Sequence, residues 1–258
     1  MQLKKDAVVL GIETSCDETA VGIVKGGRKI LADEIISSAA EHVRFGGVVP
    51  EIASRAHTEA VLEATKRALG AAGMSFGDID AIAVTYGAGL LGALLVGVSF
   101  AKGLAYALDK PLVAVNHIRG HIAAAYLADE ALEPPFVTLL ASGGHTAVIR
   151  VKDYLGHEVL GSTLDDAAGE AFDKTARVLG LEYPGGPNVE KLARQGKNAI
   201  KFPAMLKGSH TYDFSYSGLK TSVVNYVHSK RQKGEAFSAA DVAASFQSAA
   251  LDVLAEKL

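Results

Sequence analysis

The stretch VVLGIETSCDETAVGIVK, residues 8–25, places a short polar segment between two apolar, β-branched runs. Val8 to Thr14 and Thr19 to Lys25 each fit a buried strand, and Ser15 to Glu18 forms the polar interruption. A pair of glycines follows, which is typical of a hairpin turn, and we expect a third strand over Lys29 to Ser37. The N-terminal region therefore predicts three consecutive antiparallel strands.

The same pattern returns in the middle of the chain, in FVTLLASGGHTAVIRV at residues 136–151. Phe136 to Ala141 and Thr146 to Val151 fit two strands, and Ser142 to His145 is the turn between them. In both stretches the triplet Thr-Ala-Val follows the turn. Two matching strand–turn–strand units predict a duplicated α/β protein, with two similar lobes around one ligand cleft.

Helical and strand patterns alternate between the two hairpins, as in a sheet covered by helices. The expected elements are a helix over Pro50 to Gly70, a strand over Ile79 to Tyr86, a helix over Leu90 to Leu108, a strand over Leu112 to Asn116 and a helix over His117 to Leu127. The uncharged stretch 81–101 has the length of a membrane span, but its glycines favour a buried strand, a turn and a buried helix.

The remainder of the chain is expected to be mainly helical. The expected elements are helices over Asp165 to Leu179, Val189 to Gln195, Gly218 to Lys233 and Ser238 to Leu258, with a rigid loop at Tyr183 to Pro187. We assign residues 1–130 to the first lobe and 131–258 to the second, which carries a helical insertion at about 152–235. Because the chain ends inside a helical pattern, without a cap or closing strand, we expect a truncated, incomplete second lobe.

Overall charge excludes one class of function. The 258 residues carry 26 basic and 29 acidic side chains, a net charge of −3, which excludes a protein that coats nucleic acid by charge alone. Net charge does not exclude local basic patches that bind nucleic acid. The candidates are Lys191, Arg194, Lys197 and Lys201, or Lys230, Arg231 and Lys233. The same residues are equally compatible with ordinary solvated helix faces. The single cysteine, Cys16, is typical of a reducing cytoplasmic protein.

Both hairpin turns are candidate ligand sites. The first combines hydroxyl groups with two adjacent carboxylates, Asp17 and Glu18, a combination that can hold a metal or accept a proton. The second, Ser142 to His145, offers backbone N–H groups beside two glycines, which is typical of an anion site. The structural alternatives are a polar turn capped by Asp17 and a tight hairpin whose glycines only supply positive φ.

His117 and His121 are spaced i, i+4 and fall on one face of the expected helix, so both imidazoles can reach one metal ion. No glutamate follows the first histidine, which argues against a zinc-protease motif. A third ligand would have to come from elsewhere. The structural alternative is a pair of surface histidines or satisfied core histidines.

Acidic residues gather at the start of the helix expected over 165–179. Asp166, Glu170 and Asp173 would lie on nearly one face of it. A helix dipole explains carboxylates in the first turn, but it does not explain Asp173 two turns further on. The glycine-rich loop that follows can bring its backbone close to a ligand. The segment Phe214 to Lys220 reads as a helix entrance that is either a cap or an anion contact.

These motifs together resemble those of a known family, the tRNA threonylcarbamoyladenosine biosynthesis protein TsaD, formerly Gcp. The matching segments are Gly11–Thr19, Gly46–Arg55, His117 with His121, Ser142–Thr146, Asp165–Lys174, Tyr183–Pro187 and Phe214–Thr221. The resemblance covers essentially the whole chain. A small departure is Ala88, where the family usually has proline.

The resemblance implies the duplicated actin/Hsp70/sugar-kinase (ASKHA) fold and a transferase. The implied reaction moves a threonylcarbamoyl group from threonylcarbamoyl-AMP to the exocyclic amine of the tRNA adenosine adjacent to the anticodon. Asp17 and Glu18 would line the reaction cleft, with Asp17 preferred as the base. The implied substrate-binding residues are Leu140, Ala141, Ser142, Gly143, Gly144, Asp173, Gly186 and Glu190.

The resemblance also implies a metal ion. His117 and His121 would bind one ion per subunit, usually Fe2+, with Zn2+ and Mg2+ as alternatives. The family's third ligand is an aspartate near its C-terminus, which we expect to be missing from this chain. We therefore expect weak metal retention and low activity.

The implied partners are tRNA, threonylcarbamoyl-AMP and, in bacteria, the degenerate paralogue TsaB and the ATPase TsaE, with no membrane. The alternatives are an ASKHA-type kinase or ATPase, which would not need the histidine pair, a metalloprotease, and a catalytically incomplete scaffold subunit.

Overall fold

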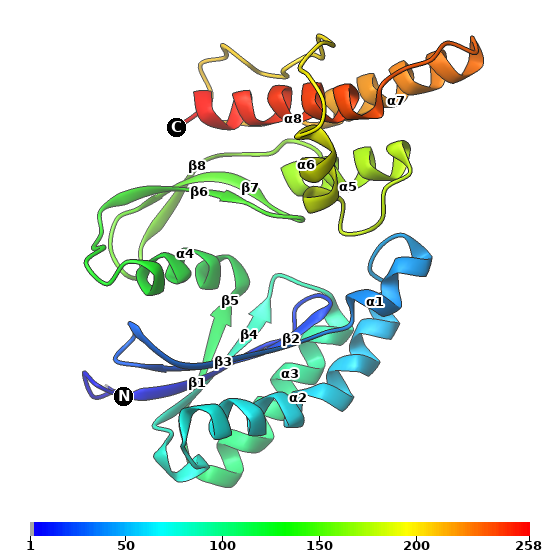
Figure 1. Cartoon of the computed structure of the whole chain (residues 1–258). Coiled ribbons are helices and arrows are strands. Elements are labelled where there is room, and N and C mark those ends of the chain that lie inside the picture. Colours follow the sequence, from blue (N-terminus) through cyan, green and yellow to red (C-terminus); the bar gives the residue numbers. More distant parts are fainter. Residues whose placement is uncertain (1–2) are drawn as a thin grey trace. The chain divides into compact units, whose positions relative to one another are not determined.

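A five-stranded sheet organises unit 1, which ends at Leu132, in the computed structural model of residues 3–258 (Figure 1). Its strands are β1 (Val8–Glu13), β2 (Glu18–Lys25), β3 (Lys29–Ser37), β4 (Ala81–Gly87) and β5 (Leu112–Asn116). The spatial order is β3-β2-β1-β4-β5, with β1, β2 and β3 antiparallel and β1, β4 and β5 parallel. The three antiparallel strands expected at the N-terminus are therefore confirmed.

Helices α2 and α3 cover one face of this sheet. The helical segments of unit 1 are α1 (Ala39–His42), η1 (Val43–Phe45), α2 (Pro50–Ala72), η2 (Phe76–Asp78), α3 (Leu91–Leu108) and α4 (His117–Ala128). Val61 of α2 and Ala101 of α3 share a core with Leu10 and Ile82 of the sheet. Because side chains alternate along a strand, Gly11 and Glu13 of β1 face away from that core.

Helix α3 is long and apolar enough, by length and composition, to cross a membrane. Its small buried residues Ala93, Gly97, Ala101 and Ala105 recur every four positions and so form one stripe along the helix. This stripe packs against the core of unit 1, whereas Leu91, Leu95 and Tyr106 on the rest of α3 are exposed, so the helix is only partly buried.

Unit 2, Glu133–Leu258, has a three-stranded antiparallel sheet and four helices. They are β6 (Phe136–Ala141), β7 (Thr146–Val151), β8 (His157–Ser162), α5 (Ala168–Leu179), α6 (Gly185–Ala193), α7 (Ser217–Gln232) and α8 (Ala239–Glu256). One apolar core joins the sheet to the helices, and Phe214, Tyr216 and Phe246 are its largest fully buried side chains.

The two hairpins match in register as well as in sequence. Glu13 pairs with Ala20 across β1 and β2, and Leu140 pairs with Ala147 across β6 and β7. Each pair encloses six residues, 14–19 in unit 1 and 141–146 in unit 2. The repeat inferred from Thr-Ala-Val is thus a repeat of the backbone pairing.

Three expectations for unit 2 need correction. Strand β8 lies inside the range 152–235 that was expected to be helical. Helix α5 begins at Ala168 instead of Asp165, and α6 begins at Gly185, so part of the expected rigid loop is its first turn. The cause at α5 is that the carboxylate of Asp165 is engaged at the start of α7, away from its own helix.

Candidate functional site

The turn between β1 and β2 is anchored by contacts with α3. The Thr14 hydroxyl donates to the carbonyl of Ala93 at 2.9 Å, and the Leu90 amide donates to the carbonyl of Ser15 at 2.8 Å. Gly97 faces Thr14 so closely that a Cβ there would overlap the threonine hydroxyl. Helix α3 therefore fixes the first half of this turn.

Two fully buried histidines hold the second half. His57 of α2 lies 2.7 Å by Nδ1 from the Thr19 hydroxyl and 3.0 Å by Nε2 from the Cys16 carbonyl. A carbonyl only accepts, so Nε2 carries the proton and Nδ1 accepts from Thr19. His57 thereby connects the two ends of the segment that contains Asp17.

His42 acts through Ser38. Its Nδ1 accepts from the Val49 amide at 3.2 Å, which leaves Nε2 to donate to the Ser38 hydroxyl at 3.1 Å. That hydroxyl donates to the carbonyl of Asp17 at 2.7 Å, and the Ser38 amide donates to the same oxygen at 3.0 Å. The sequence reading missed both histidines, because their partners lie outside the recognised motifs.

The predicted catalytic carboxylates lie on this fixed turn. Asp17 is half-buried, and Glu18 is exposed at the first position of β2. Burial and the neighbouring carboxylate of Asp17 together raise the pKa of the Cys16 thiol to about 11. The Asp17 side chain is thus next to the only cysteine of the chain.

His117 and His121, on the first turns of α4, point their Nε2 atoms at one another. The two nitrogens are 3.0 Å apart, and the rings are nearly perpendicular at 82°. Asn116 caps the helix by accepting from the Ile118 amide at 2.9 Å. The predicted i, i+4 pair is therefore a real juxtaposition of imidazoles.

Glu13 orients this pair, a role that the sequence reading did not assign to it. The Nδ1 of His117 donates to Oε2 of Glu13 at 3.2 Å, and the Ser15 hydroxyl lies 3.2 Å from the same nitrogen. Burial by itself would raise the pKa of Glu13, but hydrogen bonds from His117, Ser15 and Thr85 outweigh it and lower the pKa to about 2. The hydrogen bond from Glu13 raises the pKa of His117.

This arrangement fits a metal ion. Two imidazole nitrogens that bind one tetrahedral ion at about 2.1 Å lie roughly 3.4 Å apart, so the hydrogen-bonded Nε2 atoms, 3.0 Å apart, need to separate only slightly to share an ion. A carboxylate on the other ring nitrogen is the usual support of a metal-binding histidine. Within residues 3–258, no group of three or more His, Cys, Asp or Glu side chains is placed to hold a metal, so the described part supplies two ligands.

A cavity of about 490 Å³ lies between the sheet and α4 and includes this cluster. The small residues Gly11 and Gly22 of the sheet, with Gly120 and Ala124 of α4, keep the helix from filling the space. The lining is mostly apolar, with polar groups from Glu13, Thr85 and the two histidines. His121 is exposed, so a group held near the imidazoles would remain accessible from solvent.

The turn Ser142–His145 of unit 2 is closed by its own backbone. The Ser142 amide donates to the His145 carbonyl at 2.8 Å, and the His145 amide donates to the Ser142 hydroxyl at 3.1 Å. Gly143 and Gly144 are exposed, and a Cβ on either would meet nothing within 4 Å. Neither has a positive φ, so the alternative that these glycines only supply positive φ is wrong.

Asp173 positions the start of α6. Its Oδ1 accepts from the Gly185 amide at 2.7 Å, and a Cβ on Gly185 would collide with the Asp173 backbone. Burial raises the pKa of Asp173, although the amides of Gly185 and Gly186 oppose the shift. Gly186 itself faces open space. Asp173 and Gly186 were predicted as separate ligand contacts, and the structure brings them together at the start of α6.

The other acidic residues do not form the single helix face that was expected. Asp165 accepts from the amides of Tyr216 and Ser217 and from the Ser215 hydroxyl, which caps α7. Asp166 forms ion pairs with Lys174 at 2.9 Å and Lys220 at 2.6 Å, and Glu170 pairs with Lys174 at 2.7 Å. Glu190 is exposed and pairs with Arg194 at 2.5 Å. These contacts serve the fold of unit 2.

Sequence relatives match nearly the whole chain. The TsaD family model, described as tRNA N6-adenosine threonylcarbamoyltransferase, matches residues 29–258. A protein of that name from Clostridium perfringens is 56% identical over 250 residues, which cover 96% of this chain and 74% of that protein. One from Moorella thermoacetica is 56% identical over 257 residues, covering 99% and 75%. The chain thus spans about three quarters of these relatives.

Solved structures match the fold at low identity. Component A of (R)-2-hydroxyglutaryl-CoA dehydratase from Acidaminococcus fermentans aligns with a TM-score of 0.54 and 15% identity, covering 97% of this chain and 77% of that one. The activator of 2-hydroxyisocaproyl-CoA dehydratase from Clostridium difficile, with bound ADPNP, gives 0.51 and 15%, covering 96% and 74%. The predicted ASKHA-type fold is confirmed.

Proposed function

Because this chain belongs to the TsaD family of tRNA N6-adenosine threonylcarbamoyltransferases, we propose that its two units supply different parts of that transfer. Unit 1 holds a metal ion on His117 and His121, and its β1–β2 turn supplies the base. Unit 2 holds the phosphate of the donor. The observation that carries the proposal is the pair of Nε2 atoms 3.0 Å apart with Glu13 behind it.

The donor in this proposal is threonylcarbamoyl-AMP, a mixed anhydride. The exposed turn at Gly143 and Gly144 leaves room for its phosphate to approach the backbone, and amide groups in such turns bind anions. The first turn of α6, positioned by Asp173, presents Gly186 to the same kind of ligand. Both features lie in unit 2.

The metal proposed for unit 1 is Fe2+, with Zn2+ as the alternative that imidazole ligands also suit. Family members are metal-dependent. When bound, such an ion polarises a carbonyl or phosphate oxygen as a Lewis acid. Glu13 keeps the proton of His117 on Nδ1, so that the Nε2 lone pair remains available.

Asp17 is proposed as the base. The adenosine amine attacks the carbamoyl carbon, the bond from that carbon to the phosphate oxygen breaks, AMP leaves, and the amine proton passes to the Asp17 carboxylate. Glu13 is poorly suited to this role, because a carboxylate with a pKa of about 2 is a weak base. The contacts of His57 and Ser38 to the turn fix the backbone that carries Asp17.

The test is a reconstituted single-turnover reaction. It contains the protein, tRNA, threonine, bicarbonate, ATP and the proposed partners, the paralogue TsaB and the ATPase TsaE, and modified adenosine is measured by mass spectrometry. Asp17→Asn should abolish transfer and leave donor binding intact, whereas Asp33→Asn, an exposed change on β3, should alter neither. Normal turnover by Asp17→Asn would show that the base is another group.

A further inference from the structure

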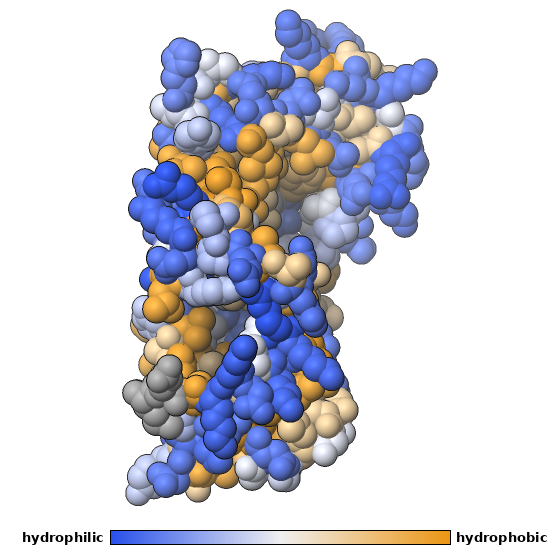
Figure 2. Space-filling view, turned by 90° about the vertical axis from the view of Figure 1, so that its left-hand side faces the viewer, coloured by the Kyte–Doolittle hydropathy of each residue, from blue (hydrophilic) through white to orange (hydrophobic). Residues whose placement is uncertain are grey.

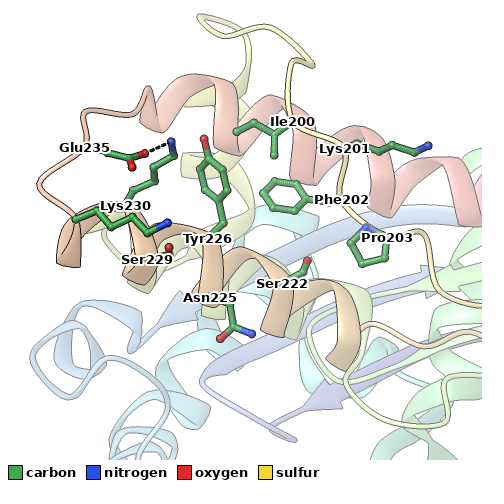
Figure 3. A pocket seen from close by; sticks show the side chains of 11 residues that line it. Ile200, Lys201, Phe202, Pro203, Ser222, Asn225, Tyr226, Ser229, Lys230 and Glu235 are labelled. Atoms are coloured by element: carbon green, nitrogen blue, oxygen red, sulfur yellow. Dashed lines mark hydrogen bonds and ion pairs between the residues drawn. The ribbon is translucent and has the colours of Figure 1, made fainter.

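The two basic clusters that the sequence offered as alternatives contribute to a single pocket in unit 2. The pocket has a volume of about 500 Å³ and lies between the segment Ile200–Pro203 and helix α7 (Figure 3). Lys201 comes from the first cluster, and Lys230 and Lys233 come from the second. Chain folding has therefore combined charges that are about thirty residues apart in the sequence.

Helix α7 is built to present one polar face to this pocket. The residues Ser222, Asn225, Tyr226, Ser229, Lys230 and Lys233 line it. Their spacing of three or four positions places them along one side of α7. Leu219, Val223 and Val227 occupy the adjacent face of the helix and are buried in the core. The polar wall of the pocket therefore follows from the spacing of polar residues along α7.

Aromatic rings form the base of the pocket. Phe202 is buried, and its ring meets that of Tyr226 edge to face, with centroids 5.9 Å apart. Tyr226 is also edge-on to Phe237 at 6.4 Å. The rings therefore hold Tyr226 in place between Phe202 and Lys230, and Lys201 lies on the far side of Phe202 (Figure 3).

The local charge is positive although the whole chain is not. Three lysines and one glutamate line the pocket, a net charge of +2, against −3 for the chain. Lys230 is paired with Glu235 at 2.5 Å, and its ammonium lies 5.8 Å from the centre of the Tyr226 ring. Lys201 and Lys233 are exposed, and within residues 3–258 neither forms an ion pair with an acidic side chain. Two of the three cations can therefore engage an external anion.

We propose that this pocket binds the backbone of the tRNA substrate. Phosphates of the tRNA contact Lys201 and Lys233, and a ribose or base lies against the polar face of α7. Lysines supply the affinity for phosphate, and hydroxyl and amide side chains suit the 2′-hydroxyl of RNA. None of these residues belongs to the sites proposed for metal, donor or base. In the view of Figure 2, hydrophilic residues predominate over the part of unit 2 that carries α8. The inference rests on the proposed function, because it takes tRNA as the substrate.

The test is tRNA binding and turnover by the full chain carrying Lys201→Glu and Lys233→Glu together. The matched control, Lys25→Glu with Lys29→Glu on the β2–β3 hairpin, changes the net charge equally. Fluorescence anisotropy with labelled tRNA should show a Kd at least about tenfold higher for the pocket variant only. The slope of log Kd against log salt should fall by about 1.5, since each lost phosphate contact removes roughly 0.7 to 0.9.

Turnover separates the outcomes. The pocket variant should raise the KM for tRNA and leave kcat near the wild-type value, and Tyr226→Phe, which keeps the ring packing, should have a smaller effect of the same kind. Unchanged tRNA binding and an unchanged salt slope would overturn the proposal. Unchanged tRNA binding with weakened binding of the protein partners would overturn the proposal and identify an acidic protein surface as the ligand instead. Failure of the wild type to bind or modify tRNA would overturn the proposed function itself.

Discussion

The two hairpin turns share a register, but they differ in how many side chains hold them. In unit 1, the Thr14 hydroxyl donates to the backbone of α3, while the side chain of His57 of α2 contacts Cys16 and Thr19, and that of His42 of α1 supports the contact of Ser38 with Asp17. In unit 2, the turn at Ser142 is closed by its own backbone and hydroxyl, and the Gly169 amide of α5 donates to the Ser142 carbonyl at 3.1 Å; a Cβ on Gly143 or Gly144 would meet nothing within 4 Å.

This difference indicates a division of labour. A turn held by buried side chains fixes the groups it carries before any ligand binds, which suits a base and a neighbouring metal pair. A turn with exposed amides and no side chains in the way suits a ligand that must approach the backbone. Variants that disturb one turn and spare the other test this division of labour.

The largest effect is expected from His121→Ala. Removing one of two imidazole ligands should release the metal and lower the rate of transfer by at least about 100-fold, since a Lewis acid supplies several kcal/mol. Donor binding, which we assign mainly to unit 2, should fall by much less than the transfer rate. Metal analysis and single-turnover kinetics measure both, with the exposed His210→Ala as control. Equal loss of donor binding would refute the division of labour.

The next effect concerns glycines. Gly97→Ala should destabilise the protein by about 1–3 kcal/mol, because the new methyl group would overlap Thr14. Gly143→Ala should change the free energy of unfolding by less than about 0.5 kcal/mol, because its methyl group meets nothing. It should instead raise the KM for the donor. Urea unfolding and donor kinetics test the contrast, and comparable unfolding free energies for the two variants would contradict it.

The reactivity of Cys16 can report how firmly His57 holds the β1–β2 turn. His57→Gln places an amide near the position of Nε2 and His57→Asn near that of Nδ1, so each retains one of the two contacts. The variant that loses the Cys16 contact, His57→Asn, should loosen the thiol environment and bring the raised pKa of Cys16 down toward its ordinary value. Alkylation of this single cysteine at pH 8 should then be roughly tenfold faster. Equal rates in both variants and the wild type would show that His57 does not restrain the turn.

The smallest effect is the pH dependence of stability in the metal-free protein. The pKa of Glu13 is lowered from 4.5 to about 2, so its contribution is complete above pH 4.5 and is lost as the pH falls toward 2. The pKa of His117 is raised above 6.5, so its contribution is complete below pH 6.5 and is lost as the pH rises through the raised value.

Stability from this pair should therefore be greatest between about pH 4.5 and 6.5, by about 1 kcal/mol or less, because both side chains are partly exposed. Urea unfolding across pH measures it. Glu13→Gln should flatten both limbs, and a profile that keeps its maximum in this variant would exclude the pair as the cause.

Much of the architecture was predictable because the strands follow local patterns of apolar and turn residues. The strands at 29–37, 112–116, 136–141 and 146–151 have the expected bounds, since apolar runs and turn residues delimit them. Strand β8 was missed because His157, Glu158 and Gly161 weaken its apolar pattern. Local patterns thus fail where a strand has few apolar residues.

The candidate site was predictable only in part. The i, i+4 spacing of His117 and His121 reveals their common face, but Glu13 reaches His117 across 104 residues of sequence, and His57 reaches Cys16 across 41. The start of α5 was misplaced for the same reason, because Asp165 caps a helix about fifty residues away. Only folding brings these partners together.

The equal length of the two loops has a consequence for how such a protein diversifies. Because matched pairs of strand residues enclose six positions in each copy, neither loop needed an insertion to acquire its present character. Substitution alone, from hydroxyl and carboxylate side chains in one copy to glycines in the other, yields two unlike surfaces on one inherited backbone. The segments 14–19 and 141–146 can therefore be exchanged between the two hairpins without changing the length of either one.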